Sequence, residues 1–158
     1  SEVEHNDDVI FKPLFSYEMV GICSKDHPLA EKEIWDAEDF ADETWVTYPV
    51  PDDMLDLLRK VLKPKGINPT RRTTELTIAM IQLVASRRGI ATIPYWAALP
   101  YLEKGYVVAR KVTKEGLYSN LYAAIRKEDE SLSYLEDFYQ TVKAQSFSTL
   151  PGLSVLDL

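Results

Sequence analysis

Residues 73–96, which indicate a central helix and the strand after it, read Thr-Thr-Glu-Leu-Thr-Ile-Ala-Met-Ile-Gln-Leu-Val-Ala-Ser-Arg-Arg-Gly-Ile-Ala-Thr-Ile-Pro-Tyr-Trp. The apolar residues of this stretch recur at a spacing that places them on one side of an α-helix. The members of this predicted stripe are Leu76, Ala79, Met80, Leu83 and Val84. Because such a stripe is buried against another element, we expect this helix to pack in the core.

The ends of this helix are marked by residues that favour helix boundaries. Thr73 or Thr74 is expected to cap the first turn, since a threonine hydroxyl accepts a hydrogen bond from a first-turn N–H group. The arginine pair 87–88 suits the negative end of the helix dipole, and Gly89 is expected to stop the helix in the left-handed conformation. A short buried strand, residues 90–93, follows. This order indicates half of an α/β unit.

Size and composition set the first limits on function. The chain has 158 residues, about one domain's worth, and a net charge of −7. Because nucleic-acid affinity depends mainly on Lys and Arg neutralising phosphates, we expect this segment to be a poor DNA binder by itself. No apolar run approaches the roughly 20 residues that a membrane span needs, so we expect no membrane contact. Cys23 is the only cysteine, which excludes an internal disulfide and favours a reducing cytoplasm.

Strand and helix patterns alternate along the chain. Predicted strands cover residues 9–11, 14–15, 17–23, 44–48, 68–72, 90–93, 106–109 and 117–126, with Pro13 marking an edge or a break. Predicted helices cover residues 37–41, 52–63, 73–88, 97–103 and 133–147, the last opened by a capping box at Ser133 and Glu136. Alternation of this kind predicts an α/β fold, with mainly parallel sheets and helices on both faces.

Motifs for catalysis and metal binding are weak. Cys23 and His27 are four positions apart, but no third group completes either a catalytic set or a tetrahedral metal site. The adjacent Asp52 and Asp53 are interpreted as residues that open a helix. The chain has no G-x-S-x-G, Walker or dinucleotide-binding motif. We therefore expect no enzyme, no cofactor and no metal site, with a small enzyme using Cys23 as an alternative that thiol reactivity across pH would test.

A binding site is the remaining expectation. In open α/β sheets, ligands bind beyond the carboxyl ends of strands and against helix N-termini, which attract anionic groups. Two segments satisfy this pattern, one at the end of the strand 44–48 and one at the start of the helix predicted over residues 73–88. The predicted effector-binding residues are Thr47, Tyr48, Pro49, Thr73, Thr74, Glu75 and Thr77. The alternative is that these threonines only cap helices.

Two segments carry a family resemblance. One is Pro13-Leu14-Phe15, followed by an apolar strand and Asp26-His27-Pro28-Leu29-Ala30. The other is a helix that ends in Leu-Val-Ala-Ser-Arg-Arg-Gly-Ile-Ala-Thr-Ile-Pro, residues 83–94. Together they resemble LysR-type transcriptional regulators over nearly the whole chain.

This resemblance implies a two-lobed effector-binding domain similar to type 2 periplasmic binding proteins, with one full lobe and part of the other in this chain. Residues 1–21 would be the end of the first lobe and a crossing strand, and residues 22–118 the second lobe. Residues 119–158 would be the return crossing strand and the closing helix, packed on the first lobe. An N-terminal winged helix-turn-helix and a linker helix would precede this chain, as would the first half of lobe one. That part would carry the other wall of the effector site.

The resemblance is strongest to family members that control methionine biosynthesis, through residues 13–23, 47–52 and 101–108. It implies homocysteine as the effector, with its carboxylate at the N–H groups of residues 73–77 and its ammonium on Glu75. It further implies a homo-oligomer that contacts promoter DNA only through the N-terminal part outside this chain. The chain begins without Met, so we expect it to be a fragment. A substrate-binding lobe of a transport protein, which shares the fold class, is the second possibility.

Overall fold

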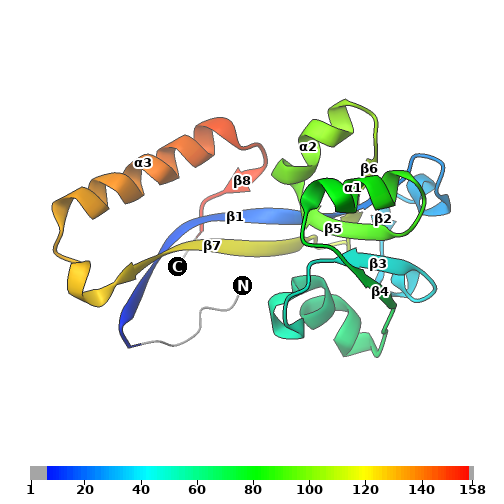
Figure 1. Cartoon of the computed structure of the whole chain (residues 1–158), viewed down its shortest axis with the longest axis horizontal. Helices are drawn as coiled ribbons and strands as arrows, with labels where there is room; N and C mark the ends of the chain where they lie inside the picture. The colour runs from blue at the N-terminus through cyan, green and yellow to red at the C-terminus, as the bar shows by residue number, and fades with distance from the viewer. Residues whose placement is uncertain (1–6, 157–158) are drawn as a thin grey trace. The chain divides into compact units, whose positions relative to one another are not determined.

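The computed structural model describes residues 7–156 and divides the chain into two compact units (Figure 1). Unit 2 is continuous in sequence and comprises Glu18–Leu117. Unit 1 is built from the flanking segments, residues 7–17 and 118–156. Strand β1, Val9–Cys23, contributes to both units. Every helix within residues 7–156 is too short or too polar to span a lipid bilayer.

The sheet of unit 2 is mixed, with strands in the order β2-β6-β1-β5-β3-β4. Parallel pairs join β3 to β4, β3 to β5 and β2 to β6, whereas β1 runs antiparallel to β5 and β6. The carboxyl ends of β3 and β4 therefore lie at one edge, and the amino ends of β3, β4 and β5 at the opposite edge. The bounds are Ile34–Trp35 for β2, Thr44–Thr47 for β3, Thr70–Thr73 for β4, Ile90–Pro94 for β5 and Val108–Val112 for β6.

Both faces of this sheet are covered, because successive strand residues point to opposite sides and enter two separate cores. Trp45 and Ile90 belong to one core, whereas their neighbours Val46 and Ala91 belong to the other. The longer helices, α1 (Thr77–Ala85) and α2 (Tyr95–Glu103), contribute to the second core. Short helices contribute to the first core, namely η1 (Pro28–Glu31), η2 (Ala37–Phe40) and η4 (Leu58–Leu62).

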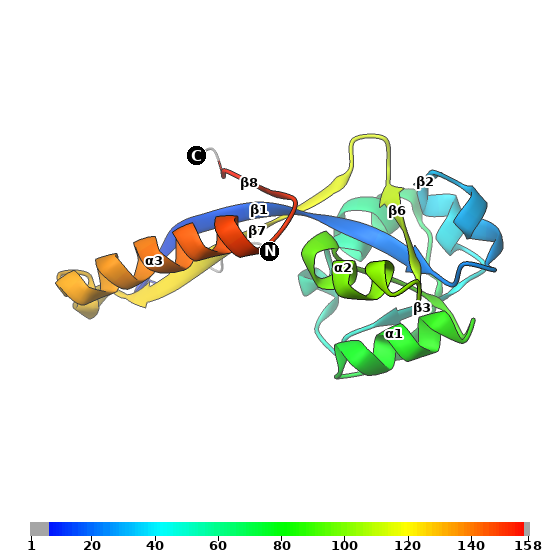
Figure 2. The ribbon, with the colours of Figure 1, turned by 90° about the horizontal axis from the view of Figure 1, so that it is seen from above.

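Unit 1 combines one long helix with strands. Helix α3, Ser133–Thr149, packs against β1 through a small core of Leu14, Phe15 and Tyr139. Figure 2 shows α3 running along β1 and β7. Both β7 (Leu117–Arg126) and β8 (Leu153–Ser154) pair with β1, and the short helix η6 (Lys127–Asp129) follows β7.

The predicted start of the central helix is wrong by one turn. Helix α1 begins at Thr77, and its N-cap is Leu76, whose side chain is 63% exposed rather than part of the buried stripe. Thr73 is instead the last residue of β4 and pairs with β3. Backbone pairing to a neighbouring strand thus prevails over the local capping preference of threonine. Ile81, outside the predicted stripe, is fully buried.

The end of α1 also differs from the prediction. Arg87, with φ of 59°, takes the left-handed position expected of Gly89. The N–H groups of Arg87 and Arg88 donate to the carbonyls of Val84 and Leu83, which completes a Schellman motif. Gly89 is required for a different reason, since a Cβ there would lie 2.4 Å from the Thr44 carbonyl oxygen.

Two predicted helix features are absent from the described structure. Residues 52–63 do not form one regular α-helix, because the extended backbone of Leu55 separates η3 (Asp52–Met54) from the residues that follow. Beyond Leu55 the chain stays helical, and the π-helical η4 continues directly into η5 (Lys63–Lys65). The capping box predicted at Ser133 is not formed, because Ser133 is already the first residue of α3 and Glu136 binds Lys12 instead.

Pro13 and the starts of two elements also differ from the prediction. Strand β1 continues through Pro13 without a break, which a strand tolerates where no ladder bond needs the missing N–H. Helix α2 begins at Tyr95, two residues before the prediction, and contains Pro100. Strand β6 begins at Val108 rather than at residue 106.

Candidate functional site

The structure brings together the two predicted segments of the effector site. Thr47 ends β3, is only 4% exposed, and pairs in register with Thr73 at the end of β4. The Thr74 N–H donates to the Thr47 carbonyl at 3.0 Å, which ties the chain leaving β4 to the end of β3. The carboxyl ends of these two parallel strands therefore form one continuous rim just before α1.

A pair of hydroxyls connects this rim to the helix. The Tyr48 hydroxyl and the Thr77 Oγ1 are hydrogen bonded at 2.6 Å, and Thr77 is the first residue of α1. Thus Thr47, Tyr48, Thr73, Thr74 and Thr77 lie in one connected group. Pro49 and Glu75 flank it in the sequence and are exposed. Among the described residues Glu75 forms no ion pair, so its carboxylate is available to a ligand.

This group has the chemistry that an anionic ligand needs. The N-cap residue Leu76 has no side-chain acceptor, so the first N–H groups of α1 donate no hydrogen bond to the cap side chain. These donors and the positive end of the helix dipole favour a carboxylate or a similar anion. Neither Thr73 nor Thr74 is the N-cap of α1, so the alternative that they cap this helix is wrong.

Cys23 and His27 do not form a catalytic pair in the structure. Cys23 is fully buried, and burial raises the pKa of its thiol to about 11, so the nucleophilic thiolate is scarce at neutral pH. His27 is engaged elsewhere: its Nδ1 accepts from the Leu29 N–H at 3.1 Å, and its Nε2 lies 3.3 Å from Glu43. Within residues 7–156, no three His, Cys, Asp or Glu side chains are grouped to hold a metal ion.

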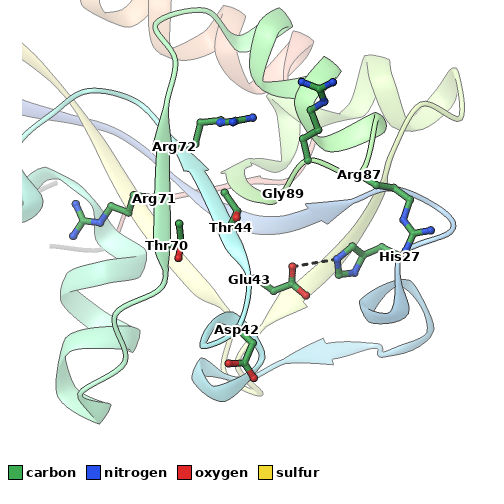
Figure 3. Close-up of a pocket in the computed structure, with 10 residues that line it drawn as sticks. His27, Asp42, Glu43, Thr44, Thr70, Arg71, Arg72, Arg87 and Gly89 are labelled. Carbon is green, nitrogen blue, oxygen red and sulfur yellow. Dashed lines mark hydrogen bonds and ion pairs between the residues drawn. The ribbon is translucent and has the colours of Figure 1, made fainter.

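A second site, which the sequence prediction missed, lies at the opposite edge of the same sheet. A hollow of about 610 Å³ opens at the amino ends of β3, β4 and β5, and four arginines contribute to its lining (Figure 3). The pairs Arg71-Arg72 and Arg87-Arg88 are visible in the sequence. Only the parallel pairing of β3 with its two neighbours shows that both pairs lie at the same end of the sheet.

Comparison with known proteins identifies the family. The model of the LysR substrate binding domain matches residues 1–146. The chain belongs to this family. The predicted resemblance and the predicted α/β fold, similar to type 2 periplasmic binding proteins, are thereby confirmed, and the sheet of unit 2, predicted to be mainly parallel, has both parallel and antiparallel pairs.

Within the LysR family, the chain is similar to individual regulators. The chain is 94% identical to the transcriptional regulator MetR of Haemophilus influenzae over 158 residues, 100% of this chain and 51% of that protein. It is 36% identical to MetR of Escherichia coli over 151 residues, 96% of this chain and 47% of that protein. The chain thus spans about half the length of these curated relatives.

A solved structure agrees with this assignment. The regulatory domain of MetR, a LysR family regulator from N. meningitidis, matches with a TM-score of 0.93 and 63% identity, over 99% of this chain and 73% of that chain. The chain is therefore a MetR-like effector-binding domain of a LysR-type regulator. These relatives are named as transcriptional regulators, and none of the three is named as a transport protein or an enzyme.

Proposed function

We propose that this chain senses homocysteine and thereby controls methionine-biosynthesis genes in a MetR-like regulator. The observation that carries the proposal is the hydrogen bond between Tyr48 and Thr77, which joins the end of β3 to the start of α1. This bond holds hydroxyl groups beside helix N–H donors, at the edge of the sheet where α/β folds bind ligands. The similarity to MetR proteins supports the choice of a sulfur-containing amino acid.

Homocysteine has chemical groups that fit this site. In the proposed pose its carboxylate accepts from the first N–H groups of α1, where the helix dipole stabilises negative charge. Its ammonium pairs with the exposed carboxylate of Glu75, one residue before the N-cap. The hydroxyls of Tyr48 and Thr77 supply further polar contacts. Thr47, Pro49, Thr73 and Thr74 shape the rim around the ligand.

The role of the whole regulator follows as part of this proposal. Units 1 and 2 would correspond to the two predicted lobes, 1–21 with 119–158 and 22–118. An N-terminal winged helix-turn-helix would bind promoter DNA, and the regulator would act as a homo-oligomer in the cytoplasm. Homocysteine would change its DNA geometry only through different affinities for two arrangements of the domain.

Calorimetric titration of homocysteine tests the proposal directly. The titration is made into this chain and into the full-length regulator, with methionine and cysteine as control ligands. We expect homocysteine to bind the full-length regulator more tightly than either control. Absence of heat in both proteins would overturn the assignment of homocysteine.

A pair of variants then locates the site. Glu75→Gln removes the proposed partner of the ammonium, so we expect about a tenfold loss of homocysteine affinity in the full-length regulator. Glu103→Gln, at the end of α2, is the matched control, because it removes another exposed carboxylate that lies outside the proposed site. Equal affinities of the two variants would remove Glu75 from the site without affecting the choice of ligand.

A further inference from the structure

The hollow at the amino ends of β3, β4 and β5 is separate from the proposed homocysteine site. Thr44, which begins β3, lies in its wall, whereas Thr47, which ends the same strand, belongs to the homocysteine site. Its volume of about 610 Å³ lies within the usual range for small-molecule sites, roughly 300–1,000 Å³. It is therefore large enough for a metabolite of its own.

The arginines of β4 have different roles. Successive strand residues point to opposite faces, and Figure 3 shows Arg71 and Arg72 extending to opposite sides of β4. Arg71 is neutralised: it donates to Asp52 at 2.6 Å and lies over the Trp45 ring, 5.8 Å from its centroid. Arg72 is exposed and, among the described residues, forms no side-chain hydrogen bond or ion pair. It is free to bind a ligand.

Two further arginines come from the end of α1. Arg87 and Arg88 are exposed, and neither forms a side-chain hydrogen bond or ion pair within residues 7–156. The helix dipole stabilises cations at this position, but it does not account for Arg72, which lies on a strand. Arg87 holds a left-handed conformation, which glycine would adopt at lower strain.

The wall also contains two carboxylates, which limit what can bind. Glu43 is held by His27 at 3.3 Å, as the dashed line in Figure 3 shows, and Asp42 lies beside it in the sequence. Both would repel a long phosphate backbone, as would the chain's net charge of −7. A compact anion can contact the arginines and avoid the carboxylates. These charges favour a small ligand over nucleic acid.

We propose that this hollow binds a small oxyanion with at least two negative charges, from a phosphate-bearing or polycarboxylate metabolite. Guanidinium groups bind phosphate and carboxylate through paired N–H donors, and three of them here have no protein anion as partner among the described residues. A single exposed ion pair contributes little, so a ligand with one charge would bind weakly. A ligand with several charges can engage more than one of Arg72, Arg87 and Arg88.

Calorimetric titration of this chain tests the proposal with four probes: pyrophosphate, inorganic phosphate, citrate and acetate. We expect heat from pyrophosphate or citrate and none from acetate. Tighter binding of pyrophosphate would indicate a phosphate-bearing ligand, and tighter binding of citrate would indicate a polycarboxylate. Absence of heat from all three multivalent anions would overturn the proposal. Binding of duplex DNA that pyrophosphate and citrate cannot displace would also overturn it.

Variants locate the binding. The double variant Arg72→Gln/Arg87→Gly removes two guanidinium groups, and glycine accepts the left-handed backbone at position 87 without strain. We expect its affinity for the multivalent anion to fall at least about tenfold. Arg126→Gln, an exposed arginine of unit 1, is the control and should leave the affinity unchanged. Equal affinity of double variant and control would exclude the hollow as the site.

Because the homocysteine site does not use these arginines, the double variant separates the two proposals. In the full-length regulator, its homocysteine titration should match that of the unmodified protein. Loss of homocysteine binding together with loss of anion binding would show that the two ligands do not use independent sites, and would overturn a second site.

Discussion

The two units of this chain differ in how much apolar surface they bury. Unit 2 has a core on each face of its sheet, and its large side chains Trp35, Phe40 and Trp45 are at most 1% exposed. Within the described part of unit 1, the core contains three buried residues, Leu14, Phe15 and Tyr139. Burial of apolar area is the main favourable term in folding, so unit 2 holds most of the stability of the chain.

Helix α3 accounts for the small amount of apolar surface that unit 1 buries. It is 17 residues long, yet only Tyr139 is buried, whereas Tyr134 and Phe138 are 63% and 64% exposed. Polar contacts therefore have a larger share in holding α3, notably the bonds of Tyr139 to Pro13 and of Lys12 to Glu136. Buried apolar contacts thus hold unit 2 together, whereas hydrogen bonds and an ion pair have a larger share in unit 1.

The largest expected effect comes from emptying the core of unit 2. Trp35 packs edge-to-face on Phe40, with ring centroids 5.7 Å apart, and its indole N–H donates to the Leu29 carbonyl. We expect Trp35→Ala to lower the free energy of unfolding by about 3–5 kcal/mol. Urea unfolding followed by circular dichroism measures this loss without depending on the removed fluorophore.

Phe138→Ala, in unit 1, is the matched comparison for Trp35→Ala. Because Phe138 is 64% exposed, we expect a change within about 0.5 kcal/mol. If Phe138→Ala lowered the free energy of unfolding as much as Trp35→Ala, the inference that unit 2 holds most of the stability would be wrong.

Much of this architecture is predictable from the sequence, because the spacing of apolar residues and the positions of glycine and proline reflect the geometry of helices, strands and turns. The strand 117–126 is found with the predicted bounds, and the alternation of strands and helices leads to the confirmed fold class. Element starts are less predictable. Thr73 and Thr74 have the local character of caps, but the pairing of Thr73 with Thr47, distant in sequence, places them in and beside a strand.

The candidate sites are likewise only partly predictable from local sequence patterns. The residues around Thr47 and Thr77 could be proposed from the general rule for strand ends, and the structure adds the bond between Tyr48 and Thr77. The arginine hollow could not be proposed, because the sequence shows two separate pairs, of which one appears as helix-end cations. Whether Arg72 and Arg87 share a wall depends on parallel strand order, which local patterns do not encode.

A smaller effect is expected from one hydroxyl in unit 1. The Tyr139 hydroxyl donates to the Pro13 carbonyl, and Tyr139→Phe would leave that part-buried carbonyl without this donor. We expect a loss of about 1–3 kcal/mol in the stability of unit 1, read from hydrogen exchange of α3 amides. Tyr134→Phe, on the same helix but 63% exposed, is the control and should change little. Similar exchange in both variants would show that this bond does not hold α3.

The smallest expected effect is a pH-dependent one at Glu136. Hydrogen bonding from Gln140, and then the bond and charge of Lys12, lower the pKa of Glu136 below its ordinary value of 4.5. A carboxyl whose pKa is lower in the folded state stabilises the fold above its unfolded pKa, and this contribution is lost as pH falls through the folded pKa. Because the pair is solvent-exposed, we expect only a slight destabilisation by Glu136→Gln at pH 7.

The pH profile of that variant makes the test specific. The difference in unfolding free energy between Glu136→Gln and the unmodified chain should begin to shrink as pH falls below about 4.5, and it should close once the pH is below the lowered pKa of the folded state, where the carboxyl is neutral in both states. Asp137→Asn is the control, since Asp137 is a neighbouring exposed acid that forms no ion pair within residues 7–156. A difference for Glu136→Gln that stays constant from neutral to acidic pH would mean that packing or helix propensity, rather than charge, connects α3 to β1. The two units would then differ in how much apolar area they bury, and not in the share of charged contacts that stabilise them.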